Sequence, residues 1–237
     1  MPIKIDKDKS IAQITIDCPP VNALTSEDLK LMHIAVDNLS FDNSIKVVII
    51  NAIGNGFCAG ADRAEHSPEE GTPDKNIIKS IHDNLWKLSL SIHRCNVPVI
   101  SSCHGFVIGA GVFIPFSSDF SLATKDTYFK FPGINFKVLL GMAHANRIMP
   151  IQLVKKMIFT GEPISSNDLH SFGGLLTVCE NKDELSKAVN SLARKLTEKD
   201  RESLVIAKKL LNESEQHKID ENFRNELDAT FNFNNKQ

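Results

Sequence analysis

The sequence lacks the features that mark several classes of protein. No pair among its five cysteines has the C-x-x-C spacing, so we expect neither a disulfide framework nor a structural zinc site. No apolar run approaches the roughly 18 residues that span a bilayer. The first residues show no apolar core followed by a cleavage site. These absences predict reduced thiols in a cytoplasmic protein that has no membrane partner.

An excess of one charge is also lacking. The chain has 27 Lys and Arg residues against 29 Asp and Glu residues, and no long block of either sign. Nucleic-acid surfaces need a concentrated basic field, so we expect no nucleic-acid partner. What is present is ordinary globular composition, because 42% of the 237 residues are apolar and 24% are charged. That is enough apolar material to bury a real core.

Short apolar runs alternate with amphipathic stretches over the first part of the chain. Residues 45–52 and 97–103 are β-branched runs typical of strands buried on both faces. Residues 74–95 carry apolar side chains at helical spacing. Helical patterns dominate the last quarter. The sequence therefore predicts an α/β fold with a core over 1–177 and a helical C-terminal region over 178–237.

Small residues follow two of the predicted buried strands. The first segment reads GNGFCAGAD and the second reads HGFVIGAGV. Ligands of α/β folds bind at such strand ends, and two backbone N–H groups aimed at one oxygen form an oxyanion hole. Either segment alone is equally well read as a tight turn or as close helix–sheet packing. The two together, in this order, favour a ligand site.

These segments carry a resemblance to a known family. GFCAGAD followed by PVISSCHGFVIGAGVFIPFSSDFSLAT resembles the enoyl-CoA hydratase/isomerase (crotonase) superfamily, and so do PPVNAL upstream and MIFTGEPISSNDLHSFGGLLTVC downstream. The resemblance covers nearly the whole chain and rests on two linked motifs. It implies a crotonase-like spiral of ββα turns. It also implies a helical C-terminal region that assembles the chain into a homotrimer or hexamer.

The resemblance further implies a thioester ligand whose handle is coenzyme A or the pantetheine of a carrier protein. Coenzyme A would be part of the substrate, and no tightly bound cofactor or metal is expected. The backbone N–H groups of Ala61 and Ala110 would polarise the thioester carbonyl. The residues implied to hold coenzyme A are Val21, Ala23, Ala59, Ala61, Asp62, Arg63 and Ala64.

The sequence departs from the family pattern where the family keeps its acids. Hydration needs one carboxylate to activate water and one carboxylic acid to protonate carbon. The corresponding positions here are Phe113 and Gly133. A third position, used by some isomerases and a dehalogenase of the superfamily, is Gly141 in an ungapped alignment. None of the three can titrate, so we do not expect ordinary two-glutamate hydration.

Another group must then move the proton if the protein is an enzyme. His144 is our candidate, because it lies near the missing-acid segment and a histidine can act as acid or base near neutral pH. The alternative for His144 is a purely structural helix histidine. Other candidates, which could equally be solvated side chains, lie in the loop after the first motif and at the next helix start: Glu65, His66, Glu69, Glu70 and Lys75. His82 and His93 share a helix at a spacing that does not suit a metal pair.

Three functions follow from these observations. The first is an acyl-CoA enzyme of the hydratase/isomerase type, a lyase or isomerase of fatty acid metabolism that stabilises a thioester enolate. The second is a decarboxylating or dehydrating crotonase of a polyketide-type pathway. The third is a non-catalytic acyl-CoA binding protein that has lost its acids. For an enzyme we expect a mostly apolar site with at most one titratable group.

Overall fold

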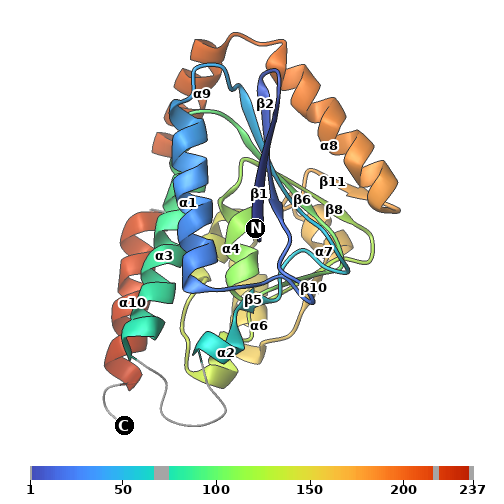
Figure 1. Cartoon of the computed structure of the whole chain (residues 1–237). Helices are drawn as coiled ribbons and strands as arrows, with labels where there is room; N and C mark the ends of the chain where they lie inside the picture. Colours follow the sequence, from blue (N-terminus) through green and yellow to red (C-terminus); the bar gives the residue numbers. More distant parts are fainter. Residues whose placement is uncertain (1, 67–74, 216–218, 235–237) are drawn as a thin grey trace.

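Three β-sheets and the helices around them form the fold in the computed structural model, which describes residues 2–66, 75–215 and 219–234 (Figure 1). The strands are β1 (Ile3–Asp8), β2 (Ile11–Ile16), β3 (Ala23–Leu24), β4 (Val47–Ala52), β5 (Gly60–Ala61), β6 (Val99–Cys103), β7 (Phe106–Ile108), β8 (Phe120–Thr124), β9 (Tyr128–Lys130), β10 (Ile164–Ser165) and β11 (Thr177–Cys179).

The helices are α1 (Ser26–Phe41), α2 (Arg63–His66), α3 (Lys75–Arg94), α4 (Ala110–Ser117), α5 (Met142–Ile148), α6 (Ile151–Thr160), α7 (Ser166–Ser171), α8 (Lys182–Thr197), α9 (Arg201–Ser214) and α10 (Ile219–Asn234), with the 3-10 turn η1 (Gly133–Phe136). Local sequence explains where several of them begin. A reciprocal cap between Thr25 and Asp28 begins α1, since each side chain bonds the other residue's backbone N–H.

The main sheet has six strands in the order β1-β2-β4-β6-β8-β11. The β1–β2 hairpin is antiparallel and every later pairing is parallel. The alternation of apolar runs and helices in the sequence predicts this arrangement, because parallel neighbours need a crossover between them. The smaller sheets, β10-β9-β7 and β3-β5, lie beyond the ends of the main strands and carry the two small-residue segments.

Helices cover both faces of the main sheet. In Figure 1, α1 and α3 lie on one side of it and α8 lies on the other. Leu185, Val189 and Ala193 of α8 are buried against Val47 and Ile49 of β4. The predicted domain boundary at residue 177 falls inside β11. The sheet therefore needs a helix from the predicted C-terminal region to cover its second face.

The last helix packs against its own chain. Figure 1 shows α10 running alongside α3, and it also contacts α5. The Arg94 guanidinium lies 2.9 Å from the Asp220 carboxylate, and the Arg224 guanidinium lies 5.0 Å from the centre of the Trp86 ring. Helix α10 thereby becomes part of the wall behind the second small-residue segment.

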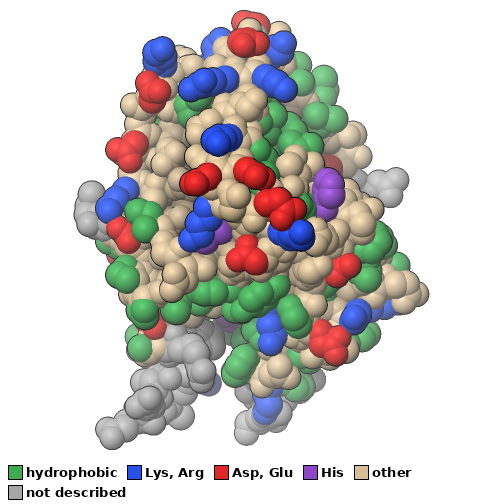
Figure 2. All heavy atoms as spheres, turned by 90° about the vertical axis from the view of Figure 1, so that its right-hand side faces the viewer, with side chains coloured by type: hydrophobic (Ala, Val, Ile, Leu, Met, Phe, Trp, Pro, Cys, Tyr) green, Lys and Arg blue, Asp and Glu red, His purple; other side chains and the backbone are tan. Residues whose placement is uncertain are grey.

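The face that carries α8 presents acidic and basic side chains interspersed with one another (Figure 2). This distribution agrees with the balanced charge of the sequence. Within the described ranges, every helix is too short or too polar to cross a bilayer.

Candidate active site

The first small-residue segment is held in place by a buried asparagine. Asn22 is 4% exposed, and its side-chain amide donates to the carbonyls of Ile53 and Gly56, at 2.7 and 2.9 Å. Its side-chain oxygen accepts from the N–H of Cys18 at 2.8 Å. The PPVNAL turn is therefore fixed against the loop that leaves β4, and β3 follows beside β5.

The residues expected to hold coenzyme A lie side by side. Ala59 donates its N–H to the Val21 carbonyl at 3.1 Å, and Ala23 pairs with Gly60 across β3 and β5. Asp62, Arg63 and Ala64 follow directly, where α2 begins. The Asp62 carboxylate accepts from the Ala64 N–H at 2.8 Å and so caps this short helix.

Gly60 brings the first segment against the second. Its φ is +105°, which side chains rarely adopt. A Cβ on Gly60 would lie 3.0 Å from the Ile108 carbonyl oxygen and 3.4 Å from the Ala110 nitrogen. A glycine is needed here for both its conformation and its small size. The backbone of β5 consequently lies directly beside the start of α4.

Ala110 is the first residue of α4, after the N-cap Gly109. The N–H groups of a first helical turn have no acceptor within the helix and carry partial positive charge. Ala61, the last residue of β5, borders the same cavity as Ala110. The two residues predicted to form an oxyanion hole are therefore brought together at one cavity.

That cavity has a volume of about 380 Å3 and lies between α3, the start of α4 and η1. Its described lining contains a single titratable side chain, His82, which agrees with the expected apolar site. The lining residues are Ala59, Gly60, Ala61, Ile81, His82, Leu85, Ile108, Gly109, Ala110, Phe113, Phe131, Pro132, Gly133, Phe136, Val138 and Leu140.

Two of the three missing-acid positions line this cavity. The Phe113 ring packs edge-on against Phe131, with 5.4 Å between the ring centroids. Gly133 begins η1, and a Cβ there would collide with the backbone carbonyl of Val138. The present backbone therefore excludes any side chain at position 133. Gly141 is instead the N-cap of α5 and is absent from the described cavity lining.

The structure corrects the prediction for His144. Its side chain is completely buried, and its ring lies 4.6 Å from Phe113 and 5.3 Å from Phe223, between centroids. Phe113 lines the cavity and His144 lies in the layer behind it. Burial, with a further effect of Arg147, lowers the pKa of His144 to about 3. This histidine is a neutral core residue and does not reach Ala61 or Ala110.

His82 is the residue that sequence reasoning missed. It lies on α3 between Ile81 and Leu85, is 3% exposed, and its ring centroid is 5.5 Å from that of Phe231 on α10. The sequence indicates only that its spacing from His93 does not suit a metal pair. Its place on the buried stripe of α3 was the available signal, but the sequence does not say that this stripe borders a cavity.

The loop candidates have other roles or lie outside the description. Glu65 accepts from the Ser26 N–H at 2.7 Å and so stabilises the start of α1. Lys75 is an exposed residue at the start of α3. The side chain of His66 and the whole of Glu69 and Glu70 lie outside the described residues.

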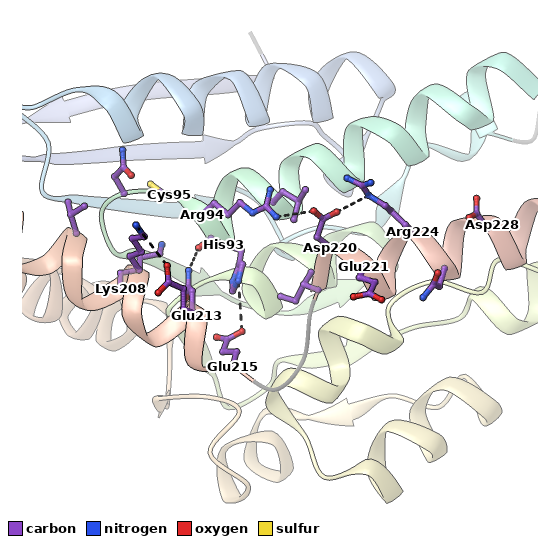
Figure 3. A pocket seen from close by; sticks show the side chains of 17 residues that line it. His93, Arg94, Cys95, Lys208, Glu213, Glu215, Asp220, Glu221, Arg224 and Asp228 are labelled. Atoms are coloured by element: carbon purple, nitrogen blue, oxygen red, sulfur yellow. Dashed lines mark hydrogen bonds and ion pairs between the residues drawn. The ribbon is translucent and has the colours of Figure 1, made fainter.

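A larger cavity of about 930 Å3 lies between the end of α3, α9 and α10 (Figure 3). Three of its charged groups pair with one another: Asp220 binds Arg94 and also Arg224, at 2.9 and 3.0 Å. His93 lies 3.9 Å from Glu215, and burial lowers the pKa of His93 to about 4. We place the active site in the smaller cavity, where backbone donors meet an apolar wall.

Among the described residues, no three His, Cys, Asp or Glu side chains are grouped to hold a metal ion.

Known proteins resemble this chain over nearly its whole length. Residues 6–237 match the sequence model of the family described as Enoyl-CoA hydratase/isomerase. The (7aS)-7a-methyl-1,5-dioxo-2,3,5,6,7,7a-hexahydro-1H-indene-carboxyl-CoA hydrolase of Mycobacterium tuberculosis is 29% identical over 94% of this chain and 89% of that protein. The short-chain-enoyl-CoA hydratase of Clostridium acetobutylicum is 25% identical, over 91% of this chain and 83% of that protein.

A solved structure gives the same answer. The crystal structure of an enoyl-CoA hydratase of Mycobacterium smegmatis superposes with a TM-score of 0.84 at 25% identity. The match covers 99% of this chain and 91% of that chain. The chain therefore belongs to the enoyl-CoA hydratase/isomerase family of acyl-CoA enzymes.

Proposed function

We propose that this protein stabilises the enolate of an acyl thioester between the N–H groups of Ala61 and Ala110. The observation that supports this most is the contact of the two small-residue segments, in which Gly60 lies against the Ala110 nitrogen. Both alanines border one cavity. A carbonyl oxygen seated there gains most from the two donors when it becomes an oxyanion, which is what lowers the barrier to reaction.

The proposed ligand is a coenzyme A or carrier-pantetheine thioester with an apolar acyl group. The acyl group would occupy the cavity of about 380 Å3, whose described walls are mostly aliphatic and aromatic. The handle would leave along Val21, Ala23 and the segment from Ala59 to Ala64. Relatives named as a hydrolase of a bicyclic dioxo acyl-CoA and as a short-chain hydratase are consistent with thioester chemistry on different acyl groups.

Two-glutamate hydration is not part of this proposal. The described cavity lining holds Phe113 and Gly133 where the family pattern places carboxylates. Without two carboxyl groups, water activation and carbon protonation lose the groups that typically contribute about a hundredfold to ten-thousandfold each. Isomerisation requires only that a proton leave one carbon of the enolate system and return to another.

Decarboxylation is the second candidate, and the apolar surroundings of Phe113 favour it. Loss of carbon dioxide needs a stabilised enolate and a later proton donor, and a desolvated substrate carboxylate is raised in energy. A non-catalytic thioester-binding protein is the third. Incubation with 3-enoyl, malonyl and 3-oxoacyl thioesters distinguishes the three candidate functions. An isomerase should move the double bond of the 3-enoyl thioester, and a decarboxylase should release carbon dioxide from the malonyl thioester. A non-catalytic binding protein should give no product with any of them.

The donors can be tested without knowledge of the substrate. A cinnamoyl-type chromophoric coenzyme A thioester absorbs further to the red when hydrogen-bond donors polarise its carbonyl. Ala110→Pro removes one N–H at the first position of α4, where proline suits a helix. Ala110→Gly is the matched control, since it shortens the side chain and keeps the N–H. We expect the red shift in the parent and in the glycine variant, and its loss in the proline variant.

For the true substrate, losing one such donor should reduce turnover by roughly a hundredfold to a thousandfold. A folded Ala110→Pro protein that keeps both the red shift and full turnover would show that Ala110 is not a donor. A parent protein that binds no coenzyme A thioester would refute the whole proposal and favour a purely structural role.

We also propose that the chain assembles as a homotrimer or hexamer. Helix α9 carries three large apolar side chains that are more than half exposed, namely Ile206, Leu210 and Leu211. Large exposed apolar side chains gathered on one helix favour a surface that is covered by another molecule. Sedimentation that shows a stable monomer at micromolar concentration would contradict this proposal.

A further inference from the structure

We propose that His82 is the catalytic residue that takes the proton from the α-carbon of the bound thioester and returns one. This inference rests on the proposed enolate chemistry and names the group that would carry it out. Its basis is a juxtaposition at one cavity, which is lined both by Ala61 and Ala110 and by His82 of α3.

His82 is the one side chain of the described lining that can exchange a proton. Apart from His82, its side chains are Ala, Ile, Leu, Phe, Pro and Val, and the rest is glycine. None of these can accept or give a proton. His144, which sequence position favoured, lies behind Phe113. Among described groups at the cavity, proton transfer therefore falls to His82, whose imidazole can accept a proton on one ring nitrogen and donate one from the other.

Packing between α3 and α10 fixes the position of the His82 side chain. His82 lies in the middle of the 20-residue helix α3, flanked by Ile81 and Leu85, which also line the cavity. On its other side, Phe231 of α10 lies against the ring at 5.5 Å between centroids, with an interplanar angle of 59°. A side chain packed between two helices holds one orientation, which is what a group aimed at a substrate carbon requires.

The proposed step is balanced. A ring-nitrogen lone pair of His82 takes the proton from the α-carbon, and the electron pair of the broken C–H bond moves through the thioester to its oxygen. The resulting enolate oxygen accepts hydrogen bonds from Ala61 and Ala110. Collapse of the enolate re-forms the carbonyl while the imidazolium gives a proton back, to the α-carbon or, for an unsaturated chain, to the γ-carbon.

A single imidazole that takes and returns one proton fits double-bond migration better than hydration. Hydration needs a second group to orient and deprotonate water. The described cavity offers none beyond His82. The inference therefore narrows the proposed function to proton-transfer reactions on an apolar acyl thioester.

The test is α-proton exchange in D2O, which needs no knowledge of the physiological substrate. Butyryl-CoA and phenylacetyl-CoA, whose α-protons differ in acidity, are incubated with the full-length protein, and deuterium uptake at the α-carbon is followed by NMR. We expect exchange with the parent protein and a decrease of at least about a hundredfold in His82→Gln. His33→Gln, a helical histidine of α1 outside the described cavity lining, is the matched control.

Two further measurements test whether the role of His82 is purely structural. The chromophoric thioester should bind His82→Gln with its red shift intact, because the donors are untouched. Added imidazole should restore exchange in His82→Ala, where the removed ring leaves space for it. Restoration of this kind requires that the missing function be proton transfer.

Three results would overturn the inference: no exchange by the parent protein, unchanged exchange in His82→Gln, or loss of thioester binding in both His82 variants. The first two leave the red shift in place, so they contradict the role of His82 and not the oxyanion hole. Absence of the red shift in the parent protein contradicts the proposed function itself.

Discussion

Phe113 and His144 face each other edge-on, with 4.6 Å between their ring centroids and an interplanar angle of 65°. Phe113 is the side of this pair that lines the cavity, and His144 is sealed behind it. At Phe113, where the resemblance to the family implies an acid, this chain has an aromatic layer that also includes Phe131 and Phe223. The floor of the cavity is consequently apolar.

Crotonyl-CoA hydration should be weak or absent, and Phe113→Glu alone should not create it. The second carboxyl group would still be missing, because a side chain at Gly133 collides with the Val138 carbonyl. Formation of 3-hydroxybutyryl-CoA, followed by chromatography, is the measurement that checks this. Turnover typical of a hydratase in the parent protein would mean that a carboxylate from outside the described residues enters the site.

His144 should make the protein less stable in acid. Its pKa falls from 6.5 to about 3 on folding, so between these values the folded state binds fewer protons than the unfolded state. Stability from this residue is complete above pH 6.5 and is lost as the pH falls toward 3. At pH 5 we expect His144 to lower the free energy of unfolding by about 2 kcal/mol. His144→Leu should remove that part of the acid sensitivity.

Urea unfolding measures the free energy of unfolding of the parent protein and of His144→Leu at pH 7.5 and pH 5. These values lie about one unit above and 1.5 units below the ordinary histidine pKa. His93, whose pKa is also lowered by burial, is present in both proteins, so its effect cancels. If both proteins lose the same free energy of unfolding between the two pH values, His144 is not a source of the acid sensitivity. We also expect His144→Leu to bind thioesters normally, because the residue is absent from the described cavity lining.

Glu226 should have the opposite pH dependence. Its carboxylate accepts from the N–H groups of Gly141 and Ala143, at 2.7 and 2.6 Å, and joins α10 to α5. Burial outweighs these bonds and raises its pKa from 4.5 to about 7. The folded state therefore binds more protons than the unfolded state between these values, and stability falls as the pH rises through 7.

The matched variant for this group is Glu226→Gln, which cannot ionise. Relative to that variant, the parent protein should lose roughly 3 kcal/mol of unfolding free energy between about pH 4.5 and pH 8. Denaturant unfolding of both proteins across this range gives the comparison. If the difference in unfolding free energy between the parent protein and Glu226→Gln stays constant with pH, Glu226 has the same charge in the folded and unfolded states at each pH.

Gly60→Ala should damage the site as well as the fold. Strain at its positive φ typically costs about 1–3 kcal/mol, and the new Cβ would lie 3.0 Å from the Ile108 carbonyl. Gly173→Ala is the control, because Gly173 also has a positive φ, of +80°, but no atom lies within 4 Å of the added Cβ. Thermal unfolding should shift in both variants, whereas only Gly60→Ala should lose the thioester red shift. Retention of the shift would show that the two segments tolerate separation.

The short strands β3, β5, β7 and β10 were not predicted. Sequence patterns did predict the buried strands β4 and β6, the helix α3 and the two small-residue segments that carry Ala61 and Ala110. Each of these features depends on local composition: β-branched runs, helical spacing, and small residues after a strand. The first motif and the second lie far apart in sequence, but each carries its own signal. Their resemblance to a family then supplied the pairing.

The proton-transfer group could not be predicted in the same way. His144 lies closer in sequence to the missing-acid segment than His82 does, and sequence distance does not reveal which side of an aromatic layer a ring occupies. Glu226 contacts Gly141 across 85 residues of chain, a contact that depends on how α10 packs. Side-chain direction and long-range helix packing decide both cases, and neither leaves a local pattern.

The placement of α8 on the far face of the main sheet has a consequence for synthesis of the chain. The apolar side chains of Val47, Ile49, Ile100 and Leu122 are made long before Leu185 and Val189, which cover them. A growing chain thus carries an uncovered sheet face until α8 has emerged from the ribosome. Exposed strand surface of this kind promotes aggregation, so chaperone dependence during translation should be greatest before residue 197 is released.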